Sequence, residues 1–282
     1  RGPRIPLFHV EEVVAQVGVD QPEIAFRLVR ACLDRELASA VEEAASELAK
    51  RPDPADPDDL SAQVTWQIMN PPAKPLERLL EHNHDWDVLV SLAETAPGPF
   101  VRAMWPWFVD VLQALVDVNA PVERDVYPLM WTFDFRFDGE DDDLQPPAPP
   151  ILSALEVAAE NLAKTPEDFR PWLQENLGVE AAPAQRLFAH ALARDGEAYA
   201  EDAYTFLMGD SRRLQLGNIH DSLATTKALI RAASPHWSAS MLKTFVQHVR
   251  TYRPPAVASH DAQRRRRRAR ALRMLRVELF RA

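Results

Sequence analysis

Cysteine and glycine are both scarce in this chain of 282 residues. The only cysteine, Cys32, excludes an internal disulfide and any cysteine-rich zinc site. A chain without disulfides is most simply placed in a reducing, cytoplasmic compartment. The chain has only 8 glycines, which is few for a β protein or a Rossmann-type protein. The composition therefore favours a helical fold.

Long apolar runs are also missing. No stretch approaches about 18 uninterrupted apolar residues, so the sequence predicts no transmembrane helix. The chain starts with Arg1-Gly2-Pro3-Arg4, which includes neither an initiator Met nor the apolar core of a signal peptide. We therefore expect the chain to be a piece of a larger cytoplasmic protein.

The motifs of nucleotide and metal enzymes are absent as well. No glycine is followed by lysine and no Gly-x-Gly occurs, which excludes a P-loop and a dinucleotide fingerprint. The densest histidine pair is His82 and His84, which on a helix would point about 200° apart and could not bind one ion, whereas in an extended turn they could. A helix start capped by Asn83 or Asp85 explains this segment better than a metal site. The sequence thus predicts no cofactor and no metal ligand.

The nearest candidates for nucleophilic catalysis are Ser211, His220 and Asp221. No Gly-x-Ser-x-Gly elbow surrounds Ser211. The local sequence is explained better by a helix that ends at Gly209 and a new N-cap at Asp210 or Ser211. We therefore assign no catalytic residue and expect a protein that is not an enzyme, with a hydrolase at His220 and Asp221 as the least favoured hypothesis.

What the chain does have is apolar residues at helical spacing, punctuated by proline. Apolar residues make up 46% of the chain, and most of the 24 prolines stand between apolar stretches. This pattern predicts roughly a dozen short helices joined by short Pro or Gly turns. The expected ranges are 6–17, 22–32, 35–50, 58–69, 76–80, 83–96, 100–118, 151–163, 166–177, 183–193, 197–208, 221–233, 238–250 and 261–282.

Such helices with short connections pack as antiparallel neighbours. We expect an all-α fold, a degenerate HEAT/TPR-like solenoid of antiparallel helix pairs with one extended acidic insertion. No strict period of about 34 residues is present, so a non-repetitive helical bundle remains the alternative. The expected organisation is N-terminal repeats over 1–118, the insertion over 119–150, C-terminal repeats over 151–259 and an Arg-rich amphipathic helix over 260–282.

Three local expectations follow from the helical pattern. Ile24, Leu28 and Cys32 share one helix face, with Cys32 expected to be a core thiol. Glycines expected at C′ positions, directly after a helix, are Gly178, Gly196 and Gly209. Trp105 and Trp107 flank Pro106 and cannot face the same side of a helix, so we expect one of them to be exposed in a groove.

The central insertion has a different period. Trp131, Phe133, Phe135 and Phe137 alternate with polar residues, which predicts a strand, and an acidic run (138–143) and a proline-rich run (146–150) follow. One interpretation is a connector whose aromatic face covers the helical core; the other is an arm whose strand edge pairs with a partner. The acidic run lacks the ligand spacing of an EF-hand loop. The candidate partner-binding residues are Trp105, Trp107, Trp131, Phe133, Phe135 and Phe137.

Charge is divided unevenly between the C-terminus and the rest of the chain. Residues 260–282 hold nine arginines against Asp261 and Glu278, a net +7, whereas the other 259 residues hold 23 basic and 40 acidic side chains, a net −17. Leu272, Leu275 and Leu279 form an apolar stripe that predicts packing on the last helix pair or on a following repeat. The alternatives are phosphate binding and an anionic membrane surface. The nucleic-acid candidates are Arg264, Arg265, Arg266, Arg267, Arg268, Arg270 and Arg273.

The sequence YTFLMGDSRRLQLGN, from Tyr204 to Asn218, resembles a motif in the helical C-terminal regions of very large bacterial P-loop ATPases of the STAND type, several of which are antiviral sensors. Residues 85–112, with their Trp, Pro and Phe punctuation, are similar to the degenerate repeats of those regions. The resemblance implies a sensor arm whose ATPase and effector lie elsewhere in a parent chain. This chain lacks the nucleotide-binding motifs of that family.

Two hypotheses therefore lead. The first is a non-catalytic helical scaffold that recognises a protein, including the rest of a parent chain, as the sensor arm of a bacterial defence ATPase. The second is a nucleic-acid-binding module that uses the Arg-rich C-terminal helix. Fold alone does not decide between them, because one helical architecture serves many roles.

Overall fold

A computed structural model describes residues 7–51, 69, 73–81, 88–118, 127, 137, 150–218, 220–253 and 262–282. The regular elements in these ranges are 12 α-helices and two short 3-10 helices, without a strand. The all-α class expected from the sequence is confirmed. The chain divides into two compact units: unit 1 comprises Arg1–Pro121 and Pro149–Ala158, and unit 2 comprises Val122–Ala148 and Ala159–Ala282.

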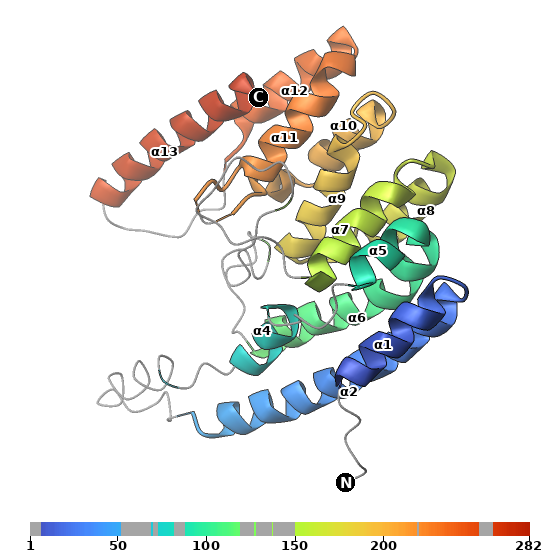
Figure 1. Ribbon diagram of the computed structural model, residues 1–282. Coiled ribbons are helices and arrows are strands. Elements are labelled where there is room, and N and C mark those ends of the chain that lie inside the picture. Colours follow the sequence, from blue (N-terminus) through green and yellow to red (C-terminus); the bar gives the residue numbers. More distant parts are fainter. Residues whose placement is uncertain are drawn as a thin grey trace. The chain divides into compact units, whose positions relative to one another are not determined.

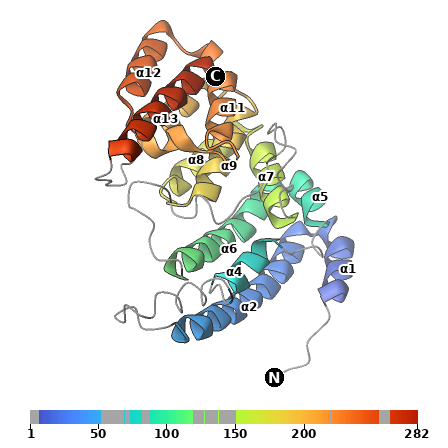
Figure 2. The same cartoon turned by 90° about the vertical axis from the view of Figure 1, so that its left-hand side faces the viewer.

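Unit 1 is built around one long helix. Helix α2 (Pro22–Ala49) packs against α1 (Leu7–Gly18), α4 (Lys74–Glu81) and α6 (Pro97–Val118), and α5 (Val88–Thr95) adjoins α6 (Figure 2). The rings of Phe26 and Phe100 meet edge to face at 5.2 Å between α2 and α6. Arg30 reaches across the same contact, donating from Nη1 to the carbonyl oxygen of Ala103 at 3.0 Å. Aromatic packing and a charged hydrogen bond thus join the two longest helices of the unit.

Helix α2 differs from the expectation in two ways. It is one helix of 28 residues, not two, because no Pro or Gly interrupts residues 33–49. Its buried stripe contains Phe26, Val29 and Leu33, whereas Ile24 and Leu28 are exposed. The expected stripe therefore lies on the outside. Two apolar stripes run along this helix, and the aromatic contact to α6 selects the one that carries Phe26.

Helix α6 is buried on more than one side. Trp105 and Trp107 are both buried, so the expectation that one of them is exposed is wrong. Pro106 lies inside the helix and on its exposed side. Trp105 packs on Phe108 with ring centroids 5.5 Å apart. Pro97 begins the helix, in the first turn, where the fixed φ of proline is tolerated.

Unit 2 is a succession of short helices. It contains α8 (Pro166–Asn176), α9 (Ala182–Ala193), α10 (Ala200–Gly209), α11 (Ala224–Ala233), α12 (Ala239–Thr251) and α13 (Ala262–Arg281), with 3-10 turns η3 (Ser211–Gln215) and η4 (Ser234–His236) (Figure 1). Helix α7 (Pro150–Leu162) is continuous through the boundary between the units, which falls after Ala158. Consecutive packed helices joined by short turns are what a helix-pair solenoid predicts.

Helix α9 is the central helix of unit 2. Every residue from Ala182 to Leu192 is buried, and α9 packs against α10 and α11. A helix covered all round has to satisfy its polar side chains internally. Gln185 does so by donating from Nε2 to the carbonyl oxygens of Leu177 and Val179, at 3.1 and 2.9 Å, just after α8 ends. The polar residues of α9 therefore bind neighbouring segments.

The helix ends show where capping signals in the sequence are sufficient. Ser238 caps α12 as expected, since its hydroxyl oxygen accepts from the backbone N of Met241 at 3.2 Å. Of the expected C′ glycines, Gly178 occupies that position, directly after the C-cap Leu177 of α8, but without a left-handed φ. The expectation is wrong for the other two, because Gly196 lies two residues beyond the C-cap Arg194 and Gly209 is the last residue of α10 itself. At the end of α8, side chains instead of a glycine turn satisfy the free backbone carbonyl group: Gln185 and Arg213 both donate to the carbonyl oxygen of Leu177.

Helices in the described ranges are all too short or too polar to cross a membrane. The strand expected over 131–138 and the histidine pair at His82 and His84 lie outside the described residues, except for Phe137.

Candidate functional site

Phe137, in the segment 119–150 (the central segment), makes a buried aromatic contact with α9. Phe137 is buried, and its ring stacks on the imidazole of His190 with centroids 4.9 Å apart. The guanidinium of Arg186, one turn earlier on α9, lies 5.2 Å from the centre of the same ring. A cation over an aromatic face is attracted by the electron density of the ring. The contact fixes the position of the His190 ring.

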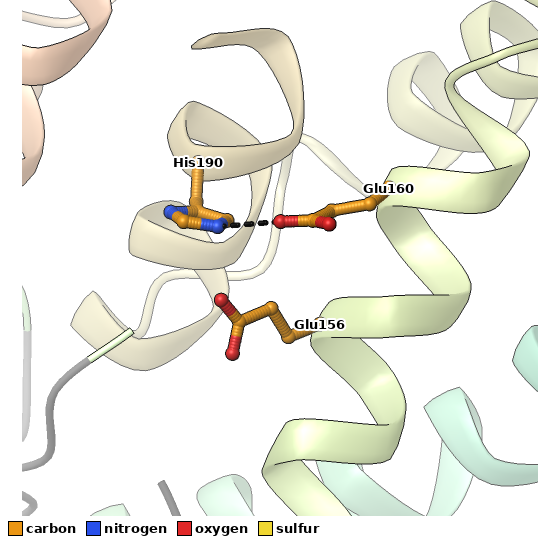
Figure 3. A group of neighbouring side chains, drawn as sticks. All are labelled: Glu156, Glu160 and His190. Atoms are coloured by element: carbon orange, nitrogen blue, oxygen red, sulfur yellow. Dashed lines mark hydrogen bonds and ion pairs between the residues drawn. The ribbon is translucent and has the colours of Figure 1, made fainter. Parts of the chain in front are cut away.

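Beside this ring lies a cluster of three metal-ligating side chains, Glu156, Glu160 and His190, shown in Figure 3. Glu156 and Glu160 are four residues apart on α7 and therefore lie on one helix face. His190 lies on α9, and its Nε2 is 2.7 Å from Oε1 of Glu160. One potential ligand atom from each residue falls within 4.8 Å of the others. Sequence reasoning missed this group, because only the Glu156–Glu160 spacing is local.

The cluster is largely removed from water. Glu156 is 5% exposed and His190 9% exposed, and the side chain of Glu160 is 15% exposed. Two carboxylates this close in a buried position repel each other unless positive charge is supplied. Arg194 supplies part of it, with Nε 2.9 Å from the same Glu160 oxygen that meets His190. The Arg194 side chain is 53% exposed, so this ion pair is screened by solvent.

A second cluster surrounds the other described residue of the central segment, Tyr127. Its hydroxyl donates to Asp210 Oδ2 at 2.8 Å, and the guanidinium of Arg212 lies 4.3 Å from the ring centre. Arg212 also donates to Asp210 Oδ2 at 2.8 Å and to Glu180 Oε1 at 3.0 Å. Burial, followed by the hydrogen bond to Asp210, raises the pKa of Tyr127 far above its usual value. Tyr127 therefore stays protonated and serves as a hydrogen-bond donor.

The motif from Tyr204 to Asn218 forms the joint between α10 and α11. Asp210 caps η3 by accepting from the backbone N of Arg212. Arg213 is buried, donating to Gln185 Oε1 at 3.0 Å and to the carbonyl oxygen of Phe206 at 2.9 Å. The hydroxyl of Thr226 on α11 connects this helix to η3 by donating to the carbonyl oxygen of Arg213 at 2.9 Å. The residues that carry the family resemblance thus make internal contacts.

The residues considered for nucleophilic catalysis have other roles in the structure. Asp210 caps the helical turn that begins at Ser211, as the sequence predicts. Asp221 pairs with Lys227, and its Oδ1 accepts from the backbone N of Leu223. His220 is exposed. The geometry thus gives no support to a hydrolase at these positions.

The Arg-rich helix α13 is anchored by its C-terminal half. Leu279 is buried, whereas Leu272 and Leu275 are half-buried, and α13 packs against α11 and α12. Arg276 donates from Nη2 to the carbonyl oxygen of Tyr252 at 2.6 Å. The packing expected of the leucine stripe is therefore present. Arg273 and Arg281 are exposed, and the side chains of Arg264 to Arg268 and Arg270 lie outside the described side chains.

The predicted partner-binding aromatics are not at the surface where the structure describes them. Trp105, Trp107 and Phe137 are buried, and Phe137 covers α9, as the connector interpretation requires. The other three, Trp131, Phe133 and Phe135, lie outside the described residues.

Exposed large apolar residues lie instead on several helices, including α1, α2, α12 and α13, and two of them are one turn apart on α2. Ile24 is 44% exposed and Leu28 36% exposed, and Cys32 follows one turn later at intermediate exposure. We call Ile24, Leu28 and Cys32 the outer stripe. Burial, with a smaller contribution from Glu36, raises the pKa of Cys32. The periodicity of the sequence marks this stripe, but it predicted burial instead of exposure.

Comparison with known proteins leaves the identification open. No protein-family model, no curated protein and no solved structure matches the chain.

Proposed function

We propose that this chain is a non-catalytic helical scaffold that recognises a protein partner through the outer stripe of α2. The observation that carries the proposal is the exposure of Ile24 and Leu28, one turn apart on a helix whose opposite stripe is already packed. Paired large apolar side chains at a surface are typical of interaction sites when they form a patch. Exposed Val13 and Val19, on and just after α1, add apolar surface to the same helical hairpin.

The outer stripe also suggests the chemistry of the partner. Arg35 continues the stripe beyond Cys32 and is exposed. An amphipathic helix that places apolar side chains on Ile24 and Leu28 and a carboxylate near Arg35 fits this arrangement. Such a partner buries two side chains that the fold itself leaves in water, which is favourable by the hydrophobic effect.

The single cysteine offers a direct test. A photo-crosslinker attached to Cys32 reports what covers the outer stripe in extracts of the source cells. We expect one protein species to be crosslinked in the full chain and lost in I24S/L28S, because both substituted side chains are exposed and their loss leaves the core intact. The crosslinked protein is then purified and titrated against both chains.

The control places the same probe in unit 2. Lys243 is exposed on α12, so C32S/K243C carries the crosslinker on a helix of the other unit. Equal adducts from the two probe positions, or a purified partner that binds wild type and I24S/L28S with the same affinity, would overturn the proposal.

We further propose that the scaffold is the sensor arm of a larger, cytoplasmic bacterial defence ATPase. The support is the sequence resemblance at Tyr204–Asn218 and 85–112. Coexpression of this chain with the ATPase region of the parent protein, followed by measurement of ATP hydrolysis, tests the proposal. The outer-stripe variant I24S/L28S should retain attachment to the parent chain and lose the response to the partner.

Nucleic-acid binding is the second candidate function, and the run of arginines in the sequence of α13 supports it. Leu279 and Arg276 hold the C-terminal half of the helix, and the part of its sequence before Arg276 contains seven arginines, from Arg264 to Arg273. Each arginine that contacts a phosphate displaces counterions, so binding weakens steeply as salt increases. Substituting Arg264 to Arg268 with glutamine removes this charge and preserves the leucines that pack.

Labelled single-stranded and double-stranded RNA and DNA, titrated at several salt concentrations, test the second candidate. Binding that is salt-dependent in the wild type and lost in the five-glutamine variant assigns phosphate recognition to α13. Absence of binding in both chains, or binding that the variant retains, would eliminate this function for α13.

A further inference from the structure

We propose that Glu156, Glu160 and His190 bind a divalent transition-metal ion, with Zn²⁺ or Mn²⁺ as the matching chemistry. The three residues offer two carboxylate oxygens and one imidazole nitrogen that all lie within 4.8 Å of one another (Figure 3). Imidazole suits Zn²⁺ and related ions, and carboxylates extend the range to Mn²⁺. This assignment is independent of the protein-recognition function.

The geometry needs only a small adjustment. Metal–ligand bonds of about 2.1 Å place the ligand atoms of one ion about 3.4 Å apart. Separations that are now at most 4.8 Å therefore shorten by up to about 1.4 Å, and the 2.7 Å between Nε2 of His190 and Oε1 of Glu160 lengthens by about 0.7 Å. Rotation about the side-chain torsions of the two glutamates supplies this movement. Glu156 and Glu160 are held at fixed spacing by α7, and His190 is held by the stacked ring of Phe137.

The charge of the cluster also favours a divalent ion. When two carboxylates and one imidazole bind a metal, the carboxylates bind as anions, whose two charges a divalent ion balances, and the imidazole binds in its neutral form. In the absence of metal, His190 and Arg194 share one oxygen of Glu160, at 2.7 and 2.9 Å. Arg194 is half-exposed, so it is able to release Glu160 and leave the remaining coordination positions to water.

The competition with Arg194 distinguishes a metal site from a purely structural ion-pair network. If a metal binds Glu160, Arg194 competes with it, and R194Q should tighten metal binding by about two- to fivefold, the strength of a half-exposed ion pair. E160Q and H190Q each remove a ligand and should weaken binding by more than about tenfold. E175Q, at an exposed carboxylate of α8, is the matched control and should bind as the wild type does.

The experiment is a calorimetric titration of the EDTA-stripped full chain with ZnCl₂ and, separately, MnCl₂. The expected result is saturable binding of one ion per chain. R194Q should bind most tightly, wild type and E175Q should bind equally and less tightly, and E160Q and H190Q should bind most weakly. Circular dichroism establishes that each variant is folded, and a Co²⁺-loaded wild-type chain should show visible absorption that H190Q changes.

If E160Q or H190Q does not fold, wild type, R194Q and E175Q still test the proposal. The absence of saturable binding of either metal to the wild type, or wild-type affinity in R194Q and in every folded ligand variant, would overturn it.

Discussion

The hydroxyl of Tyr127 donates a hydrogen bond of 2.8 Å to Oδ2 of Asp210, which joins positions 83 residues apart in unit 2. Arg212 completes the arrangement, because it bonds the same carboxylate and lies over the Tyr127 ring. One carboxylate therefore caps η3, accepts a hydrogen bond from Tyr127 and pairs with an arginine. These contacts hold Tyr127 against the turn that follows α10.

Removing the Tyr127 hydroxyl should destabilise unit 2 while keeping the aromatic contact. We expect Y127F to lower the free energy of unfolding by about 1–2 kcal/mol, because a hydrogen bond to a charged acceptor is lost and the ring stays under Arg212. Urea denaturation of the full chain measures the change. Y204F is the control, since the Tyr204 ring packs on Trp237, and its removal of a hydroxyl should have almost no effect.

The stability that Asp210 provides should depend on pH in the acid range. Burial alone raises the pKa of Asp210, but hydrogen bonds from Arg212 and Tyr127 hold it below the ordinary value of 3.8. A folded pKa below the unfolded one gives stability that is present above the unfolded value and lost as pH falls through the folded value. The advantage of wild type over D210N should be constant above about pH 5 and shrink below about pH 4.

Denaturation midpoints of wild type and D210N, measured from pH 6 to the acid limit of folding, check this. A stability difference that grows on acidification would contradict the assignment of a lowered pKa to Asp210.

Two glycines of unit 2 are required for close backbone contact. A Cβ at Gly217 would lie 2.1 Å from the carbonyl oxygen of Asp221, and one at Gly196 would lie 2.1 Å from that of Ala232. Because the obstacles are backbone atoms, G217A and G196A should each destabilise the chain by about 2 kcal/mol or more. G178A is the control, since nothing lies within 4 Å of its Cβ position. Thermal unfolding measures the stability of the three variants. If G178A destabilised the chain as much as G217A and G196A do, the space around the Cβ would not be the cause.

Arg213 should not tolerate lysine. Its guanidinium bonds Gln185 and the carbonyl oxygens of Phe206 and Leu177, in a buried position that a single ammonium group cannot reproduce. We expect R213K to lower the free energy of unfolding by about 2–4 kcal/mol. The exposed R231K on α11 serves as the matched substitution and should be neutral. If urea denaturation gave R213K the same free energy of unfolding as wild type, the hydrogen bonds of Arg213 would contribute little to stability.

The helix positions of unit 2 follow closely from local sequence. The predicted range 166–177 corresponds to α8 at Pro166–Asn176, and Ser238 caps α12 where expected. Proline fixes φ at helix starts, and a short polar side chain bonds free backbone N–H groups, so both signals act within one turn.

The candidate sites show the limit of such signals. The spacing of Glu156 and Glu160 is visible in the sequence, but His190 lies 30 residues beyond Glu160 and only the packing of α9 against neighbouring helices brings it near. Trp105 and Trp107 were expected to differ in exposure, and both are buried because α6 is covered on more than one side.

The sequence by itself determined the all-α class, the lack of nucleotide-binding motifs and the leucine stripe of α13, since these depend on composition and on contacts within one or two turns. Only the tertiary structure decided which stripe of α2 is buried, and which polar residues meet across tens of positions. Periodicity marks an apolar face, but the shape of the neighbouring helix chooses between two such faces.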